Sequence, residues 1–217
     1  MIETQGVMYL YKVLCYGDSN TWGAIPGGEE RYGRDSRWTG VLRNKLSEEY
    51  LVIEEGLNGR TTVWEDPIEG HKSGKDYLIP CLETHKPLDL VVIMLGTNDL
   101  KVRFSVSAYD VAEGAGRLVE IIRKSEVGPQ NGAPEILLVA PPPIARLSEY
   151  EQTFTGAREK SKGFSEQFKR VSEENDTYFL DAGKHASSSE KDGIHLDQKE
   201  HEKLGRAVGE KIIEIKQ

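Results

Sequence analysis

The stretch "VLCYGDSNTWG" at residues 13–23 places a short apolar run directly before a polar turn. Such a run, ended by Gly, Asp and Ser, is typical of a buried strand that stops at the edge of a sheet. Asp18 and Ser19 have a backbone reason to stand there, because both residue types cap turns and helices. Ser19 is also a candidate nucleophile, which requires a base, an orienting acid and oxyanion donors from the rest of the chain.

Four further apolar runs are predicted to be buried strands, and with the first they make five. The predicted strands cover residues 7–16, 51–57, 88–95, 135–140 and 177–181. Their apolar residues are nearly continuous rather than alternating, which indicates burial on both faces. Helical patterns lie between or after them, at 35–46, 107–125 (with Ser107 as N-cap), 156–174 and beyond Asp197. Strands that alternate with helices predict an α/β fold with a doubly wound parallel sheet.

The composition is that of a globular chain, and we expect one domain over residues 1–217. Hydrophobic residues make up 37% and charged residues 29%. A net charge of −8 without clustered Lys and Arg argues against nucleic-acid and acidic-membrane partners. Neither a secretory signal nor a membrane-spanning apolar stretch is recognisable, so a cytoplasmic location is expected. Cys15 and Cys81 show no metal-binding spacing, and no metal is expected.

Polar clusters stand where the predicted strands end, which is where ligands bind to such sheets. They are "GDSN" (17–20), "NGRTT" (58–62), "GTND" (96–99) and "DAG" (181–183), with "DGIH" (192–195) just before the last helix. We therefore expect one edge of the sheet to collect a serine, an asparagine, several glycines, acids and a histidine.

His195 is the predicted base. It follows Asp192 across a glycine in a loop, so one short turn can place the carboxylate beside Nδ1 while Nε2 points outward. Such an acid fixes the tautomer and stabilises the imidazolium that forms. Asp181, at a strand end, is the rival acid, and His185 is the alternative base. The remaining histidines are assigned to a polar loop, to the end of a helix and to the apolar stripe of the last helix (His71, His85 and His201).

Ester hydrolysis also needs donors where negative charge develops. The candidates are the backbone N–H groups of Ser19 and Gly59 and the side-chain amide of Asn98. Each has a plainer interpretation: Ser19 as a cap, Gly59 as a turn glycine and Asn98 as an Asx-turn. That all of them fall on one sheet edge favours a shared site.

These residues resemble the four ordered blocks of the SGNH hydrolases, also called the GDSL esterase/lipase superfamily. Ser19 in "GDSNTWG", Gly59 in "LNGRTT", Asn98 in "GTND" and His195 in "DGIH", with Asp192 as its acid, match the blocks in order. The similarity is greater to the branch of bacterial arylesterases that includes a mycobacterial acyltransferase or perhydrolase. It extends over about residues 12–200 through "RWTGVL" (37–42), "VIEEGLNGRTT" (52–62), "LDLVVIMLGTND" (88–99) and "APPP" (140–143).

The chain departs from the family pattern at two positions. Asn20 stands at the position of the Leu in the GDSL motif that gives the family its name. Gly59 stands where the mycobacterial enzyme has another small residue. The resemblance implies a flavodoxin-like three-layer α/β/α sandwich, no metal or organic cofactor, and small acyl groups that pass to water, alcohols or peroxide. It also implies homo-oligomers whose neighbouring subunits narrow the mouth of the site, with residues 25–36 and 143–157 as the candidate contacts.

The predicted function is that of a serine esterase acting on short-chain or aryl esters through an acyl-enzyme. Trp22 is expected to wall the substrate pocket, with packing of the following helix as the alternative, and Ile194 is expected to line the same pocket. A carbohydrate O-acetyl esterase on the same scaffold and a non-catalytic ligand-binding relative are the competing interpretations. A nucleotide-binding role is disfavoured, because no glycine-rich phosphate motif follows a strand.

Overall fold

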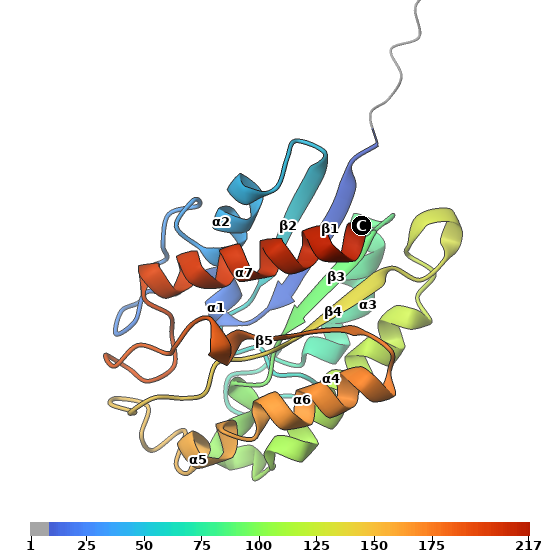
Figure 1. The fold of residues 1–217 in the computed structure, drawn as a ribbon. Coiled ribbons are helices and arrows are strands. Elements are labelled where there is room, and N and C mark those ends of the chain that lie inside the picture. The colour runs from blue at the N-terminus through green and yellow to red at the C-terminus, as the bar shows by residue number, and fades with distance from the viewer. Residues whose placement is uncertain (1–8) are drawn as a thin grey trace, which may run out of the picture.

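The computed structural model describes residues 9–217, and its centre is a five-stranded parallel sheet (Figure 1). The strands are β1 (Tyr11–Gly17), β2 (Tyr50–Gly56), β3 (Leu90–Met94), β4 (Glu135–Ala140) and β5 (Tyr178–Asp181). All five predicted strands are confirmed, with small differences at their ends. Residues 7 and 8, where the first strand was expected to begin, lie outside the described residues.

The strand order β2-β1-β3-β4-β5 brings the ends of β1, β2 and β3 to one edge. In the register of the sheet, Gly17 at the end of β1 stands beside Gly56 of β2 and Met94 of β3. The chain leaves β1 toward β2 on one side and later returns to β3 on the other. This order is the flavodoxin-like one, in which ligands bind at the switch point between β1 and β3.

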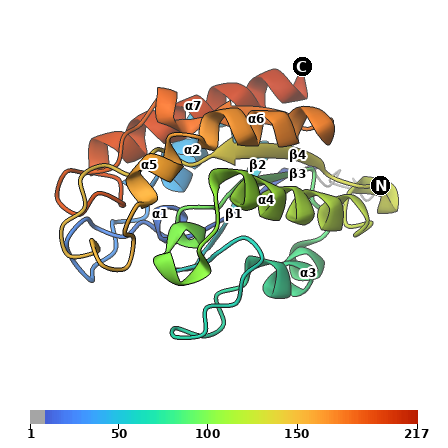
Figure 2. The same cartoon turned by 90° about the horizontal axis from the view of Figure 1, so that it is seen from below.

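Helices cover both faces of the sheet, as Figure 2 shows. The helices α2 and α7 pack on one face, while α3, α4 and α6 pack on the other. The bounds of the helices are α1 (Ser19–Trp22), α2 (Trp38–Lys45), α3 (Gly74–His85), α4 (Ala108–Arg123), α5 (Ala157–Ser161), α6 (Phe164–Glu174) and α7 (Gln198–Lys216). The predicted α/β class and three-layer arrangement are thereby confirmed.

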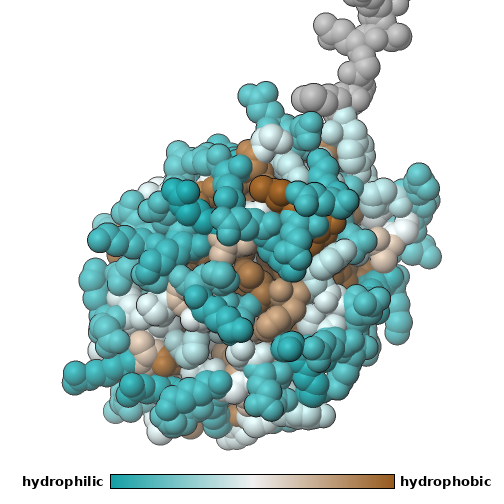
Figure 3. Space-filling model, viewed as in Figure 1, coloured by the Kyte–Doolittle hydropathy of each residue, from teal (hydrophilic) through white to brown (hydrophobic). Residues whose placement is uncertain are grey.

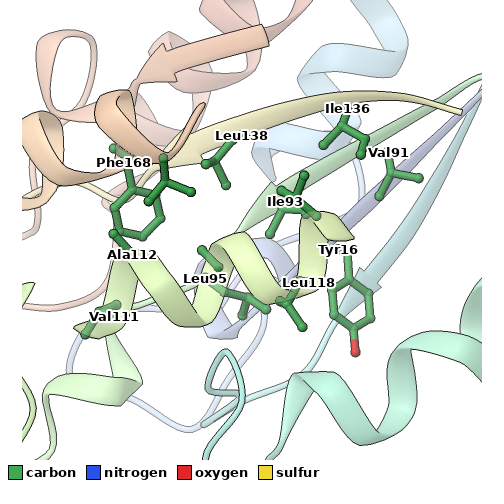
Figure 4. Packing of buried hydrophobic residues seen from close by; sticks show 14 of the residues in the cluster. Tyr16, Val91, Ile93, Leu95, Val111, Ala112, Leu118, Ile136, Leu138 and Phe168 are labelled. Atoms are coloured by element: carbon green, nitrogen blue, oxygen red, sulfur yellow. The ribbon is translucent and has the colours of Figure 1, made fainter. Parts of the chain in front are cut away.

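Two hydrophobic cores, one on each face, hold the layers together. Successive side chains of a strand point to opposite faces. In β1, Leu14 and Tyr16 enter the core beneath α3, α4 and α6, part of which Figure 4 shows, while Val13 and Cys15 enter the core beneath α2 and α7. The molecular surface seen in Figure 3 is mostly hydrophilic, with apolar residues in patches. Within residues 9–217 no helix is long and apolar enough to cross a membrane.

The predicted helix at 156–174 is wrong, because two helices occupy that stretch. The first, α5, ends at Ser161, and α6 begins at Phe164. Gly163 lies between them, and a Cβ at this position would stand 3.1 Å from the Cβ of Ala108 at the start of α4. Glycine is a poor helix former and permits this close approach, so the helical pattern is interrupted there. The predicted N-cap Ser107 is confirmed, in a capping box with Asp110.

Candidate active site

Ser19 lies at the sheet edge because β1 turns sharply into α1. β1 ends at Gly17, where a Cβ would stand 2.0 Å from Oγ1 of Thr21, so the turn requires a glycine. Asp18 is the N-cap of α1, and its Oδ1 accepts a hydrogen bond from the backbone N–H of Asn20 at 2.9 Å. Ser19 is therefore not the cap but the first residue of the helix, with its Oγ turned toward His195.

Ser19, His195 and Asp192 form one hydrogen-bonded chain. Oγ of Ser19 is 3.0 Å from Nε2 of His195, and Nδ1 of His195 is 2.7 Å from Oδ2 of Asp192. An ionised carboxylate can only accept hydrogen bonds, so Nδ1 carries the hydrogen and Nε2 can accept from the serine hydroxyl. The predicted nucleophile, base and acid thus meet although 176 residues separate Ser19 from His195.

Asp192 is fully buried, and hydrogen bonds keep it ionised. Burial raises its pKa, but the hydrogen bond from the His195 ring and the one from the backbone N–H of Ile194 lower the pKa to about 2. Oδ1 accepts from the N–H groups of Ile194 at 2.9 Å and His195 at 3.0 Å, and Oδ2 accepts from that of Gly27 at 3.0 Å. This carboxylate therefore orients both the ring and the backbone of His195.

The three candidate oxyanion donors line the same cavity. Gly59 has φ of +80°, a conformation that favours glycine, and it brings backbone close to the cavity. The amide Nδ2 of Asn98 donates to the carbonyl of Arg60 at 3.1 Å rather than forming a local Asx-turn. An amide carries two N–H groups, so this bond orients Asn98 and leaves its second hydrogen for another acceptor.

The cavity has a volume of about 480 Å³ and contains every residue predicted to touch substrate. Trp22 and Ile194 line it, as expected, and Tyr150 and Phe154 add further apolar surface. Charged side chains also line it, namely Glu29, Glu69, Lys72, Lys101 and Arg103. A larger hollow of about 650 Å³, beside residues 186–191, contains none of the predicted site residues.

The rival candidates lie elsewhere or have other partners. The carboxylate of Asp181 accepts from Oγ of Ser165 at 2.6 Å and from the N–H of Gly183 at 3.0 Å, so it is engaged away from His195. His185 is exposed. His201 is fully buried, and burial lowers its pKa to about 4, which fits the packing role predicted for it.

Some polar residues around the site were not identified from the sequence. Asn20 contacts the loop of His195, Arg60 donates to the carbonyl of Gly17 at 2.9 Å, and Asp99 accepts from the N–H of Thr62 at 3.0 Å. Burial raises the pKa of Asp99 to about 7. Only Asn20 carried a local signal, through its departure from the family motif; the other two depend on contacts distant in sequence.

One group of potential metal ligands occurs within residues 9–217, and it lies outside the cavity. Glu55, Cys81 and His85 place ligand atoms within 4.8 Å of one another. Nε2 of His85 is 2.8 Å from Oε1 of Glu55, so a hydrogen bond between them accounts for two of the three. None of these residues lines the cavity around Ser19.

Comparison with known proteins identifies the family to which the chain belongs. The profile of the GDSL-like Lipase/Acylhydrolase family matches residues 15–203. This match covers all the residues of the hydrogen-bonded chain and the candidate oxyanion donors. The chain belongs to the GDSL-like lipase/acylhydrolase family, and it is a carboxylic ester hydrolase of that family.

Solved structures of two kinds of esterase are similar to this chain. Est24, a carbohydrate acetylesterase from Sinorhizobium meliloti, is 41% identical with a TM-score of 0.91, and the match covers 94% of this chain and 99% of Est24. The aryl esterase of M. smegmatis is 39% identical with a TM-score of 0.90, with the same coverage. A further carbohydrate acetylesterase family member from S. meliloti is 36% identical with a TM-score of 0.90, covering 95% and 99% of the two chains. A search of curated proteins found none that matches.

Proposed function

We propose that the protein is a serine esterase that hydrolyses small acyl esters through an acyl-enzyme. The observation that carries this proposal is the chain of hydrogen bonds from Ser19 through His195 to the ionised Asp192, at the wall of the cavity. Ser19 Oγ attacks the ester carbonyl while Nε2 of His195 takes its proton. Asp192 holds the ring and stabilises the imidazolium.

The tetrahedral oxyanion is met by the N–H groups of Ser19 and Gly59 and by the Asn98 amide. When this intermediate collapses, the bond to the leaving alkoxide breaks, and His195 gives it the proton. Water then attacks the acyl-enzyme, again with Nε2 as base, and Ser19 regains its proton. Preorganised donors of this kind stabilise the developing charge without reorganising during the reaction. They therefore contribute a large part of the rate enhancement.

Asn98→Ala should lower kcat by about 10²–10³, with little change in KM, because it removes a donor used mainly in the transition state. The measurement is steady-state hydrolysis of p-nitrophenyl acetate. Asn131→Ala is the control and should keep the wild-type kcat, because Asn131 is exposed at the end of a short 3-10 helix before β4 and does not line the cavity. Equal kcat values for both variants would remove Asn98 from the oxyanion site.

The size and lining of the cavity favour a short acyl group and an aryl or similarly compact alcohol. Trp22, Tyr150 and Phe154 provide apolar walls, while the charged side chains that also line the cavity oppose a long alkyl chain. We expect kcat/KM to be highest for acetyl and propionyl esters and to fall by at least about tenfold for octanoyl esters. A panel of p-nitrophenyl esters of increasing acyl length on the purified protein tests this. A maximum at long chains would contradict it.

Carbohydrate O-acetyl ester hydrolysis is the second candidate. Its support is the similarity to Est24, which is about equal to the similarity to the aryl esterase. Comparing acetylated xylo-oligosaccharides with p-nitrophenyl acetate decides between the two.

We further propose acyl transfer to alcohols in water. We also propose homo-oligomers that narrow the mouth of the cavity through residues 25–36 and 143–157, since Glu29 and Tyr150 from these stretches line the cavity.

A further inference from the structure

Asn20 connects the nucleophile to the loop of the base through its side chain. It follows Ser19 in α1 and is 3% exposed. Its Nδ2 donates to the carbonyl of Ile194 at 3.2 Å, and its Oδ1 accepts from the N–H of Leu196 at 3.0 Å. Ile194 and Leu196 are the two neighbours of His195. One amide therefore binds the backbone on both sides of the base.

The chemistry of this contact selects an amide at position 20. Residues 192–197 form a loop, and its buried backbone groups have no helix or extended ladder to satisfy them. The contact needs one donor and one acceptor on the same short side chain. Asparagine offers both, aspartate when ionised offers only acceptors, and leucine, which the family name places there, offers neither.

The side chains of Asp192 and Asn20 both bind the loop of His195, and they act from different elements. Asp192 belongs to the same loop, and its carboxylate binds the ring and the N–H groups of Ile194 and His195. It also accepts from the N–H of Gly27, in the segment that follows α1, but none of its hydrogen bonds reaches α1 itself. Asn20 supplies that second connection, because its own backbone is joined directly to Ser19 and held by Asp18.

We propose that Asn20 is a positioning residue that sets the distance between Nε2 of His195 and Oγ of Ser19 by holding both backbone neighbours of the base against α1. Its effect on turnover rests on the proposed function. Misplacement of a reacting group by about 1 Å can cost about 10² in rate. Without the amide, the loop keeps its bonds to Asp192 and the backbone bonds that join Gly193 and His195 to Ala145 and Ser189. It loses the two hydrogen bonds that join its backbone to α1.

The test compares Asn20→Leu, which removes donor and acceptor, with Asn20→Asp, which keeps the acceptor for Leu196. Asn20→Leu should lower kcat by about 10–100-fold with KM within about twofold of wild type. Amide hydrogen exchange of Leu196 should accelerate in Asn20→Leu and stay slow in Asn20→Asp. Burst titration with a p-nitrophenyl ester counts active sites, so that a smaller folded fraction is not mistaken for a slower step.

Asn175→Leu is the matched control. It removes another asparagine hydrogen bond, from Nδ2 to the carbonyl of Val171 at 2.9 Å, at the end of α6 and away from the cavity. It should leave kcat and the exchange of Leu196 unchanged. Should Asn20→Leu fail to fold, Asn20→Asp carries the test, with a kcat loss expected from the missing donor to Ile194.

Wild-type kcat per active site in the Asn20 variants would overturn the proposal, as would unchanged exchange at Leu196 in Asn20→Leu. A wild-type protein inactive on every ester would instead overturn the proposed function. The exchange measurement then still decides whether Asn20 holds the loop of His195.

Discussion

Ser19→Ala is expected to abolish labelling by a fluorophosphonate probe and to lower kcat by about 10⁴–10⁶. The alanine removes the atom that forms the acyl-enzyme, so the remaining donors can only assist direct attack by water. Ser19 Oγ is 3.0 Å from Nε2 of His195, which lowers the cost of removing its proton. Mass spectrometry of peptides from labelled wild-type protein should locate the adduct on residue 19.

Ser172→Ala is the control for this experiment. Ser172, near the end of α6, is also buried, but its Oγ donates to the carbonyl of Thr177 and it does not line the cavity. This variant should be labelled as wild type is. An adduct on any serine other than Ser19, or full turnover in Ser19→Ala, would remove the proposed mechanism.

The strands and the principal site residues could be predicted because their signals are local. A buried parallel strand appears as a short apolar run, and the runs of β1, β2 and β3 are each followed by residues that line the cavity: Ser19, Gly59 and Asn98. Asp192 and His195 lie three residues apart, so their contact is a property of one turn. Once the five strands are assigned to a parallel sheet, their carboxyl ends must share an edge, and Ser19 and Asn98 come together for that reason.

The contacts that support the site could not be predicted, since they join segments far apart in sequence. Asp66 and Lys101 form an ion pair at 3.0 Å in which both side chains are buried, and this pair ties residues 64–72 to the segment after Asn98. Nothing in the local pattern distinguishes such residues from solvated charges. The break at Gly163 was missed for the same reason, because its cause is the approach of α4 rather than the local sequence.

We expect the substitution Asp192→Asn to lower kcat by about 10⁴. The carboxylate only accepts, so it keeps the hydrogen on Nδ1 of His195. An amide can turn its NH₂ toward the ring, which places the hydrogen on Nε2 and leaves no acceptor for the hydroxyl of Ser19. The N–H groups of Ile194 and Gly27 that now bind the carboxylate favour the oxygen atoms, so the amide also loses a partner in either orientation.

Asp181→Asn is the matched control, because Asp181 is the other acid at a strand end and its partners are Ser165 and Gly183. It should retain kcat within about twofold, and the opposite ranking of the two variants would move the acid to Asp181.

A pH profile of kcat adds an independent check on Asp192. The pKa of Asp192 is lowered to about 2, so the carboxylate stays ionised as pH falls and is protonated only near that value. A loss of activity between pH 7 and pH 4 in wild type must therefore arise from protonation of another group, since the orienting carboxylate remains charged throughout that range.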